Sequence, residues 1–330
     1  MNIFMYLLKT SNLIKVYNNW NMKKLKVNYI YKKLNPILFD VSLRDGLQGY
    51  SKRDQSLITL ETKKLIYNNI CFFHEPKNIE IGSIVNPKIL PVMANSIELF
   101  KDVSLEKIDL NQTNYLPSLY MLVPNKKGYD TAIENGVTNF SFLTSVSNSF
   151  QKKNINKTLE ETKKELNEMI NDVNIQRFNK PSIDYNMKLY ISCVNECPIE
   201  GKIKNDVVIN EIIYYNKNTN VNELCLSDTC GTLLFNDYQY IIDKCIEHGV
   251  ECEKISLHLH TSDNIDNIRN IVHYSLDKNI KKFDVSLITN GGCSVTMEQS
   301  KLKPNMSYEL LYKLFDEYIG KKEDKKKTSK

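Results

Sequence analysis

The sequence has no long apolar run. No stretch of the 330 residues approaches the roughly 20 consecutive apolar residues that span a membrane. The apolar residues 3–8 lack the flanking lysines and the small-residue cleavage site of a secretory signal. We therefore expect no membrane partner. The expected location is the cytoplasm, or the mitochondrion if the basic N-terminus is a presequence.

Acidic residues are absent from residues 1–36, which hold seven lysines, and only two accompany the six lysines of residues 321–330. The whole chain carries +5, so residues 37–320 carry a net −6. A nucleic-acid-binding protein needs a basic face on its folded body, so we expect no nucleic acid partner. The composition predicts a basic N-terminal extension over residues 1–36, disordered or targeting, one catalytic domain over residues 37–320, and a lysine-rich tail over residues 321–330.

Paired cysteines are missing, since none of the eight cysteines forms a CxxC pair or a small disulfide framework. Most lie in apolar runs, as free cysteines of a reducing compartment do. Histidine is scarce too, with five residues, yet His258 and His260 share one apolar stretch. Residues two apart in a strand point to the same face. Together they could offer two metal ligands, although two satisfied structural histidines are the alternative.

Short apolar runs alternate with amphipathic stretches from residue 36 onward. Eight runs are expected to be strands: Ile37–Ser42, Asn78–Ser83, Ser118–Val123, Asn139–Thr144, Lys188–Val194, Glu223–Asp228, Ile255–His260 and Phe283–Ile288. Eight strands in βα order predict an α/β fold of one domain, a (β/α)8 TIM barrel with parallel strands. A doubly wound open sheet is the alternative, but it would need a glycine-rich phosphate turn after its first strand, where the chain reads RDGLQG.

Three helices have recognisable starts. Thr158 and Glu161 predict a capping box at the start of a charged helix. Asn236 is predicted to cap a second helix. Ser307 is predicted to cap a last helix that ends near Gly320.

Polar groups cluster where such a barrel carries its active site, at the carboxyl ends of several strands. The clusters are Arg44-Asp45-Gly46, Glu80, Ser227-Asp228-Thr229, His258 with His260, and Asn290-Gly291-Gly292-Cys293. Each alone could be a turn former, a helix cap or an ion-pair partner. Five on one rim indicate a functional site.

The chemistry of these groups favours an open metal centre. A carboxylate, two imidazoles and a nearby amide oxygen suit Mg²⁺, Mn²⁺ or another divalent cation better than a closed zinc site. Such an ion acts as a Lewis acid on a chelated hydroxyl and carbonyl. Arg44 could stabilise a developing enolate, and Cys293 could deliver a proton from a closing loop. An inert loop thiol is the alternative for Cys293.

Several separate stretches carry a family resemblance. They are RDGLQ at 44–48, NIE at 78–80, SIVNPK at 83–88, KKNIN at 152–156, YISCV at 190–194 and CPIEGKI at 197–203. From about residue 37 to about residue 318 the chain resembles the 3-hydroxy-3-methylglutaryl-CoA lyases, which belong to the aldolase-like metal-dependent lyases and acyltransferases built on this barrel.

The resemblance implies divalent-metal-dependent cleavage of 3-hydroxy-3-methylglutaryl-CoA to acetyl-CoA and acetoacetate, as in leucine degradation and ketone-body formation. It implies an acyl-CoA as the small-molecule partner and a possible homodimer. The metal ligands it implies are Asp45, His258, His260 and Asn305. Asn305 is the match because Asn305-Met306-Ser307 is similar to the Asn-Leu-Ala segment of the family.

The resemblance also implies roles for four further side chains. Arg44 would stabilise the enolate of acetyl-CoA, and Cys293 would protonate it. Glu80 and Asp228 match acids that either face the substrate or support the metal ligands, as carboxylates behind metal-bound histidines commonly do.

This sequence departs from the family pattern around the site. Thr261 and Asn264 stand where the family has Asp and Gly after its HxH motif, and the GLGGCP loop reads TNGGCS at 289–294. Two alternatives follow. The chain could be a related aldol-type lyase or acyltransferase acting on another acyl-CoA or a 2-oxo acid, or a catalytically inactive barrel used for binding.

Overall fold

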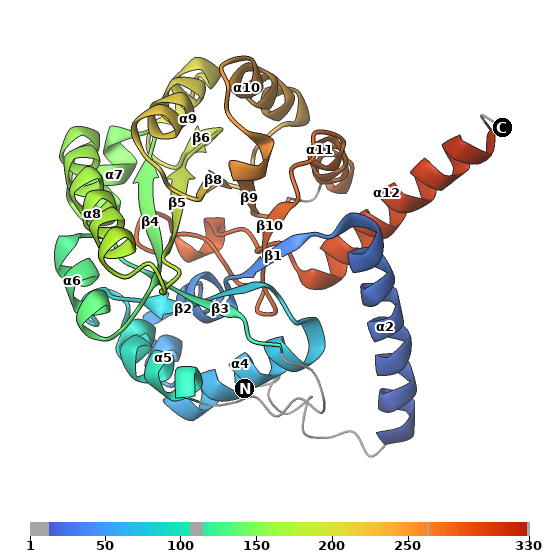
Figure 1. The fold of residues 1–330 in the computed structure, drawn as a ribbon, viewed down its shortest axis with the longest axis horizontal. Helices are drawn as coiled ribbons and strands as arrows, with labels where there is room; N and C mark the ends of the chain where they lie inside the picture. Colours follow the sequence, from blue (N-terminus) through green and yellow to red (C-terminus); the bar gives the residue numbers. More distant parts are fainter. Residues whose placement is uncertain (1–12, 106–114, 263, 329–330) are drawn as a thin grey trace.

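Eight parallel strands close into a barrel in the computed structural model, which describes residues 13–105, 115–262 and 264–328 (Figure 1). Their order around the barrel is β1-β10-β9-β8-β5-β4-β3-β2. The strands are β1 Ile37–Asp40, β2 Asn78–Ser83, β3 Ser118–Leu122, β4 Asn139–Ser145, β5 Asn186–Ser192, β8 Glu223–Asp228, β9 Ile255–Leu259 and β10 Lys282–Val285. The predicted single-domain (β/α)8 barrel is confirmed, and each predicted strand overlaps an observed one.

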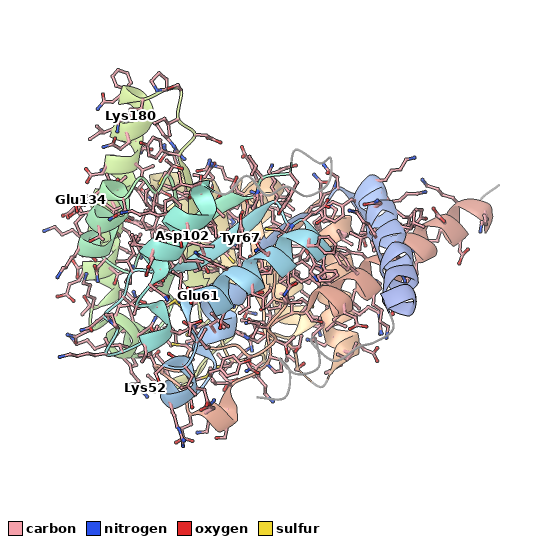
Figure 2. All side chains as sticks on the ribbon, turned by 90° about the horizontal axis from the view of Figure 1, so that it is seen from below. Lys52, Glu61, Tyr67, Asp102, Glu134 and Lys180 are labelled. Carbon is pink, nitrogen blue, oxygen red and sulfur yellow. The ribbon has the colours of Figure 1, made fainter. Side chains whose placement is uncertain are left out.

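Helices surround the barrel. They are α3 Lys52–Gln55, α4 Leu60–His74, α5 Ser96–Leu105, α6 Lys126–Glu134, α7 Asn148–Ile155, α8 Leu159–Asn179, α9 Asn205–Asn218, α10 Phe235–Glu247, α11 Ile265–Asp277 and α12 Tyr308–Thr328. A short antiparallel pair, β6 Glu196–Cys197 and β7 Gly201–Lys202, follows β5. Charged side chains such as Lys52, Glu134 and Lys180 lie at the periphery, whereas Tyr67 of α4 is buried (Figure 2).

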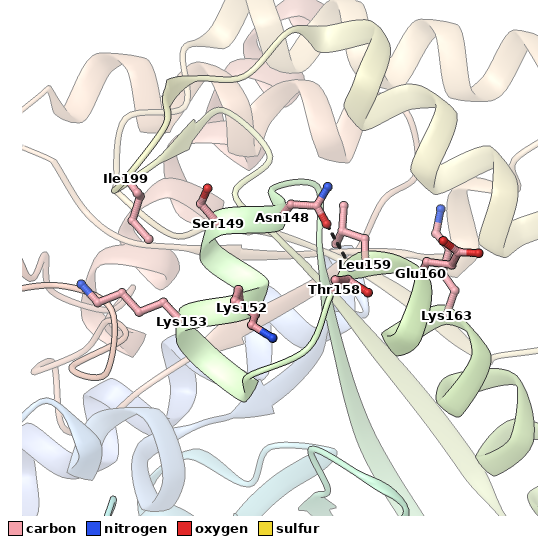
Figure 3. Close-up of a pocket in the computed structure, with 9 residues that line it drawn as sticks. All are labelled: Asn148, Ser149, Lys152, Lys153, Thr158, Leu159, Glu160, Lys163 and Ile199. Atoms are coloured by element: carbon pink, nitrogen blue, oxygen red, sulfur yellow. Dashed lines mark hydrogen bonds between the residues drawn. The ribbon is translucent and has the colours of Figure 1, made fainter.

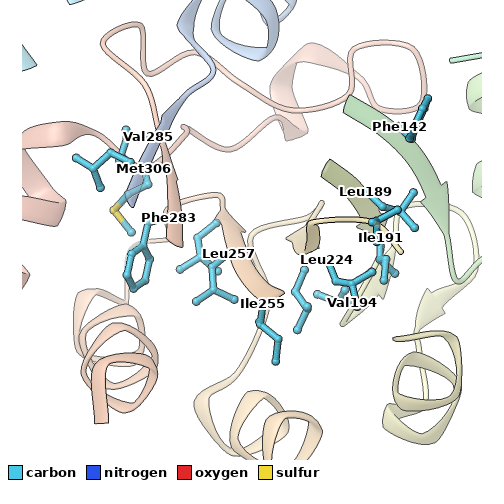
Figure 4. Packing of buried hydrophobic residues seen from close by; sticks show 14 of the residues in the cluster. Phe142, Leu189, Ile191, Val194, Leu224, Ile255, Leu257, Phe283, Val285 and Met306 are labelled. Carbon is cyan, nitrogen blue, oxygen red and sulfur yellow. The ribbon is translucent and has the colours of Figure 1, made fainter. Parts of the chain in front are cut away.

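Side chains alternate between the two faces of each barrel strand, which decides what reaches the site. Leu189, Leu257 and Phe283 pack outward toward the helices (Figure 4). Burying such a side chain contributes roughly 1.5–3 kcal/mol. Their neighbours on the same strands point into the lumen, including His258 of β9 and Asp284 of β10, which are also buried. Buried polar side chains therefore lie inside the barrel, and an apolar layer lies between the strands and the helices.

The observed helix starts show which capping motifs were sufficient to predict where a helix begins. The Thr158 capping box is confirmed, because Thr158 Oγ1 accepts from Glu161 N at 3.1 Å and Glu161 Oε2 accepts from Thr158 N at 2.7 Å. The predicted Asn236 cap is wrong. Helix α10 already begins at Phe235, and its first amide donates to Asn267 Oδ1 of α11 at 2.7 Å.

The C-terminal helix is longer than predicted. Ser307 does accept from Leu310 N at 3.1 Å, which confirms its cap. However, α12 continues past Gly320 because helix α2, Leu13–Leu34, packs beside it (Figure 1). Glu323 accepts from Tyr29 Oη at 3.0 Å and from Lys33 Nζ at 2.7 Å.

Helix α2 occupies most of the predicted N-terminal extension, and α12 takes in most of the predicted tail. The parts of those two segments at residues 1–12 and 329–330 lie outside the described residues. Within the described ranges, the helices are all too short or too polar to cross a membrane.

Candidate metal centre and active site

A tight turn after β1 aims Arg44 and Asp45 into the mouth of the barrel. Its hydrogen bond spans five residues, from Gly46 N to Val41 O at 3.0 Å, the geometry of a π-turn. A Cβ at Gly46 would lie 2.8 Å from Ile288 O. Glycine is therefore required here because the turn packs directly against the segment that follows β10.

Three buried side chains converge at this mouth. Ligand atoms of Asp45, His258 and His260 all lie within 4.8 Å of one another. His258 Nε2 is 3.2 Å from His260 Nε2 and 3.9 Å from Asp45 Oδ2. The structure thus brings together three of the four predicted metal ligands from the ends of β1 and β9.

The hydrogen bonds behind the two imidazoles set their tautomers. His258 Nδ1 lies 3.1 Å from Asp284 Oδ2, and His260 Nδ1 lies 3.0 Å from Lys303 O. Both partners are acceptors, so each neutral ring carries its proton on Nδ1 and presents a lone pair from Nε2. Burial, followed by the neighbouring His258, lowers the pKa of His260 to about 4. Two lone pairs facing at 3.2 Å repel unless a cation lies between them.

Asn305 completes the set. Its Nδ2 donates to Asp45 Oδ2 at 2.9 Å and to Asn290 O at 3.1 Å, while its Oδ1 is buried without a hydrogen-bond partner. A buried amide oxygen without a partner is costly, and a cation ligand would satisfy it. The donor set of two nitrogens and two oxygens therefore fits a divalent cation with positions left for substrate.

Arg44 keeps the carboxylate of Asp45 charged. Its Nη1 donates to Asp45 Oδ1 at 2.5 Å, and its Nε donates to Glu80 Oε2 at 2.6 Å. Burial alone would raise the pKa of Asp45, but Arg44, the two histidines and Asn305 outweigh it and hold the pKa well below its usual range. Asp45 is therefore an anion at neutral pH.

The loop after β10 lies directly over the centre. Gly292 N donates to Asp45 Oδ2 at 3.2 Å, and Gln48 Nε2 donates to Gly292 O at 3.4 Å. The next residue, Cys293, donates from Sγ to Asn154 Oδ1 at 3.4 Å. Burial raises the pKa of this thiol, so it carries its proton at neutral pH.

A cavity of about 370 Å³ joins these groups, and its lining includes Arg44, Asp45, His258, His260 and Cys293. Glu80 and Asp228 do not line it. Glu80 is fully buried behind Arg44. Both carboxylate oxygens of Asp228 accept backbone amides, from Thr232 N and Leu233 N at 3.0 Å each. Even with these bonds, burial raises the pKa of Asp228 to about 6.

Two charged residues deeper in the barrel than the centre, Lys188 and Asp284, were not predicted from the sequence. Asp284 accepts from His258 and from Tyr190 Oη at 3.0 Å, and Lys188 donates to its other oxygen. The sequence did contain a signal for them. Each stands between two apolar residues of a strand, and this alternation marks a side chain that points into the barrel.

A groove of about 1020 Å³ lies between α7, the start of α8 and the β6–β7 turn (Figure 3). Lys152, Lys153, Thr158 and Lys163 line it, and Lys153 lines the inner cavity as well. Lys153 Nζ also donates to Thr296 O at 3.0 Å, so the KKNIN segment supports the loop that carries Cys293.

The HMGL-like family model matches residues 35–266. This chain belongs to the HMGL-like family. It is 27% identical over 303 residues to the hydroxymethylglutaryl-CoA lyase YngG of Bacillus subtilis, covering 86% of this chain and 92% of that protein. It is 28% identical over 259 residues to the 3-hydroxy-3-isohexenylglutaryl-CoA/hydroxy-methylglutaryl-CoA lyase of Pseudomonas aeruginosa, covering 78% of this chain and 77% of that one.

A solved structure agrees with this assignment. The HMG-CoA lyase from Brucella melitensis superposes with a TM-score of 0.66 and 25% identity, over 86% of this chain and 90% of that one. The HMGL-like chain described here is therefore a carbon–carbon lyase by family, and the predicted resemblance is confirmed.

Proposed function

We propose that this chain cleaves 3-hydroxy-3-methylglutaryl-CoA to acetyl-CoA and acetoacetate with a bound divalent cation, Mg²⁺ or Mn²⁺. The observation that carries the proposal is the convergence of Asp45, His258, His260 and Asn305 on one point of a cavity that Cys293 also lines. The family and the named relatives support the substrate class, an acyl-CoA.

The four ligand residues would hold the cation. When bound, the ion supplies a Lewis acid that polarises a chelated hydroxyl and carbonyl. As the C3 hydroxyl gives up its proton to solvent and becomes the ketone of acetoacetate, the C2–C3 bond breaks and leaves an enolate on the acetyl-CoA fragment. Arg44, fixed by Asp45 and Glu80, presents a permanent positive charge to that enolate without needing to reorganise.

Cys293 would then protonate the enolate carbon to give acetyl-CoA. Its thiol is protonated, lines the cavity, and lies one residue after the Gly292 amide that binds Asp45. Glu80 acts by orienting Arg44, and Asp228 acts by shaping the turn after β8, because its oxygens are taken by backbone amides.

The groove between α7 and the start of α8 would receive the anionic end of coenzyme A. Lys152 and Lys153 offer two ammonium groups to phosphates there, and Lys153 links the groove to the inner cavity. The acyl group would then extend inward to the metal.

A second candidate substrate is a 3-hydroxyacyl-CoA with a longer 3-alkyl group. The wall of the cavity includes the apolar side chains of Val85, Leu122, Leu143 and Phe150. A longer alkyl chain would gain roughly 0.8 kcal/mol for each methylene it buries there. The Pseudomonas aeruginosa relative carries the name of such a substrate.

The deciding experiment strips the protein of metal, restores Mg²⁺ or Mn²⁺, and measures acetoacetate released from 3-hydroxy-3-methylglutaryl-CoA. Turnover should require metal and should be abolished in His258→Ala. The matched control is His248→Ala, since His248 is exposed at the end of α10. A wild-type protein that binds metal but releases no acetoacetate would refute the proposed reaction and leave the longer substrate or a binding role.

A further inference from the structure

The side chains below the metal centre form a buried polar layer that spans four strands. Asp284 of β10 accepts most of the hydrogen bonds in this layer. Its Oδ2 accepts from His258 Nδ1 of β9 at 3.1 Å and from Tyr190 Oη of β5 at 3.0 Å, and Cys225 Sγ of β8 lies 3.9 Å away. Its Oδ1 accepts from Lys188 Nζ of β5. Both oxygens of this carboxylate therefore accept hydrogen bonds.

Lys188 is held in place as firmly as Asp284. Lys188 is 1% exposed, and its ammonium forms ion pairs with Asp284 and with Glu223, the latter at 2.8 Å. The ammonium also lies 3.7 Å from the centroid of the Phe39 ring. A buried ammonium needs such partners, because removing either charge would leave the other uncompensated.

The layer connects directly to a metal ligand through one hydrogen bond. An ionised carboxylate can only accept, so His258 must donate from Nδ1 and present its lone pair from Nε2 toward Asp45 and His260. Lys188 occupies Oδ1 and leaves Oδ2 for the imidazole. The orientation of the ring thus depends on a lysine that lies too deep to touch substrate.

We propose that Asp284 and Lys188 are positioning residues that set the metal affinity of this centre, with Lys188 orienting Asp284 and Asp284 orienting His258. Neither lines the cavity, so neither contacts the substrate. The inference rests on the proposed function for the identity of the centre, but its test measures metal binding alone. Partners behind metal-bound histidines typically contribute 10–100-fold to metal affinity.

The test titrates metal-stripped protein with Mn²⁺ and follows free Mn²⁺ by electron paramagnetic resonance. Asp284→Asn and Lys188→Met should each raise the Kd for Mn²⁺ by about 10–100-fold. The matched control is Lys63→Met. Lys63 is also 1% exposed, but it lies on α4 outside the barrel and donates to Val92 O and Asn95 Oδ1. Its loss should lower the thermal stability and leave the Kd unchanged.

An Asp284→Asn protein that is folded by circular dichroism and binds Mn²⁺ like wild type would overturn the proposal. If that variant does not fold, ¹⁵N-histidine NMR of the metal-free wild-type protein decides. The chain has five histidines, so the spectrum is simple to assign. His258 should be protonated on Nδ1, and a ring protonated on Nε2 would overturn the proposal. Wild-type protein that binds Mn²⁺ but yields no acetoacetate would refute only the proposed cleavage of 3-hydroxy-3-methylglutaryl-CoA, because the ratio of Kd values still decides the role of Asp284.

Discussion

Gly291 offers a sharp test of the metal centre, because a single methyl group there would reach a predicted ligand. An added Cβ would lie 2.6 Å from Cγ and 2.9 Å from Oδ1 of Asn305 and would overlap its Nδ2. Real Cβ atoms do not approach that closely, so the Asn305 amide must move in Gly291→Ala. The amide would then lose its two hydrogen bonds, to Asp45 Oδ2 and Asn290 O.

The size of the effect follows from those two bonds. Each contributes roughly 0.5–1.5 kcal/mol, so together they hold the amide in its ion-facing orientation by about 1–3 kcal/mol, and binding Mn²⁺ without them would have to restore that orientation. At about 1.4 kcal/mol per factor of ten, the Kd for Mn²⁺ should rise about 5- to 150-fold, before the lost contact of Oδ1 with the ion is counted. The assay is the same Mn²⁺ titration of metal-stripped protein.

The matched control is Gly320→Ala in α12, where a Cβ would meet nothing within 4 Å. That variant should bind Mn²⁺ like wild type and should gain roughly 0.5–1 kcal/mol of stability, because alanine favours a helix interior. A folded Gly291→Ala protein with wild-type Mn²⁺ affinity would show that Asn305 does not bind the ion.

Three further outcomes are expected. Cys293→Ala should lower kcat by about 10²–10⁴-fold while the Kd for Mn²⁺ stays constant. Equal kcat values for this variant and the wild type would show that Cys293 is not the proton donor. The control is Cys252→Ala, in the short turn before β9. Burial raises the pKa of Asp40 to about 7 despite bonds from Ser42 and Tyr308, so the folded state binds this proton more tightly than the unfolded chain. The resulting stability, about 4 kcal/mol, is fully present below pH 4 and is lost as the pH rises through 7. The free energy of unfolding in urea should therefore fall less with rising pH in Asp40→Asn than in the wild type. Parallel pH profiles of the two proteins would contradict this assignment. Thr158→Ala should cost about 1 kcal/mol in urea unfolding by breaking the capping box of α8, whereas an unchanged midpoint would show that the cap contributes nothing.

The features predicted from the sequence were those set by local patterns. Period-two alternation placed His258 and His260 on one lumenal face, because a strand offers no other arrangement. Thr158 and Ser307 cap their helices through bonds within four residues of chain. The departure at Asn264, where the family has glycine, also has a local reason. Asn264 Oδ1 accepts from Asn267 N at 3.0 Å and caps α11.

The features that were missed depend on contacts between distant segments. Asn236 has good cap chemistry, but α10 begins one residue earlier because Asn267 of the next helix satisfies its first amide. Helix α12 extends beyond Gly320 because Tyr29 and Lys33 of α2 bind Glu323, almost 300 residues away in the chain. No local pattern shows such partners.

The same distinction holds at the site. The proposed ligands follow from motifs and strand ends, whereas the side chains that support them meet only in the closed barrel. Lys188 and Asp284 lie 96 residues apart, and they meet only when β5 and β10 face one another across the lumen. The sequence showed a charged residue at an inward position of each strand. It did not show that these two residues pair with each other.

The turn after β1 contributes Asp45, and the segment after β10 contributes Asn305, which lies 260 positions later in the chain. A nascent polypeptide therefore has the first of the proposed ligands long before the ribosome has made the last. During synthesis, the earlier strands can pair in sequence, yet the complete ligand set forms only when the barrel closes. Loading with metal should consequently be a late step of biogenesis, and chains interrupted before Asn305 should leave the ribosome unable to bind the ion with full affinity.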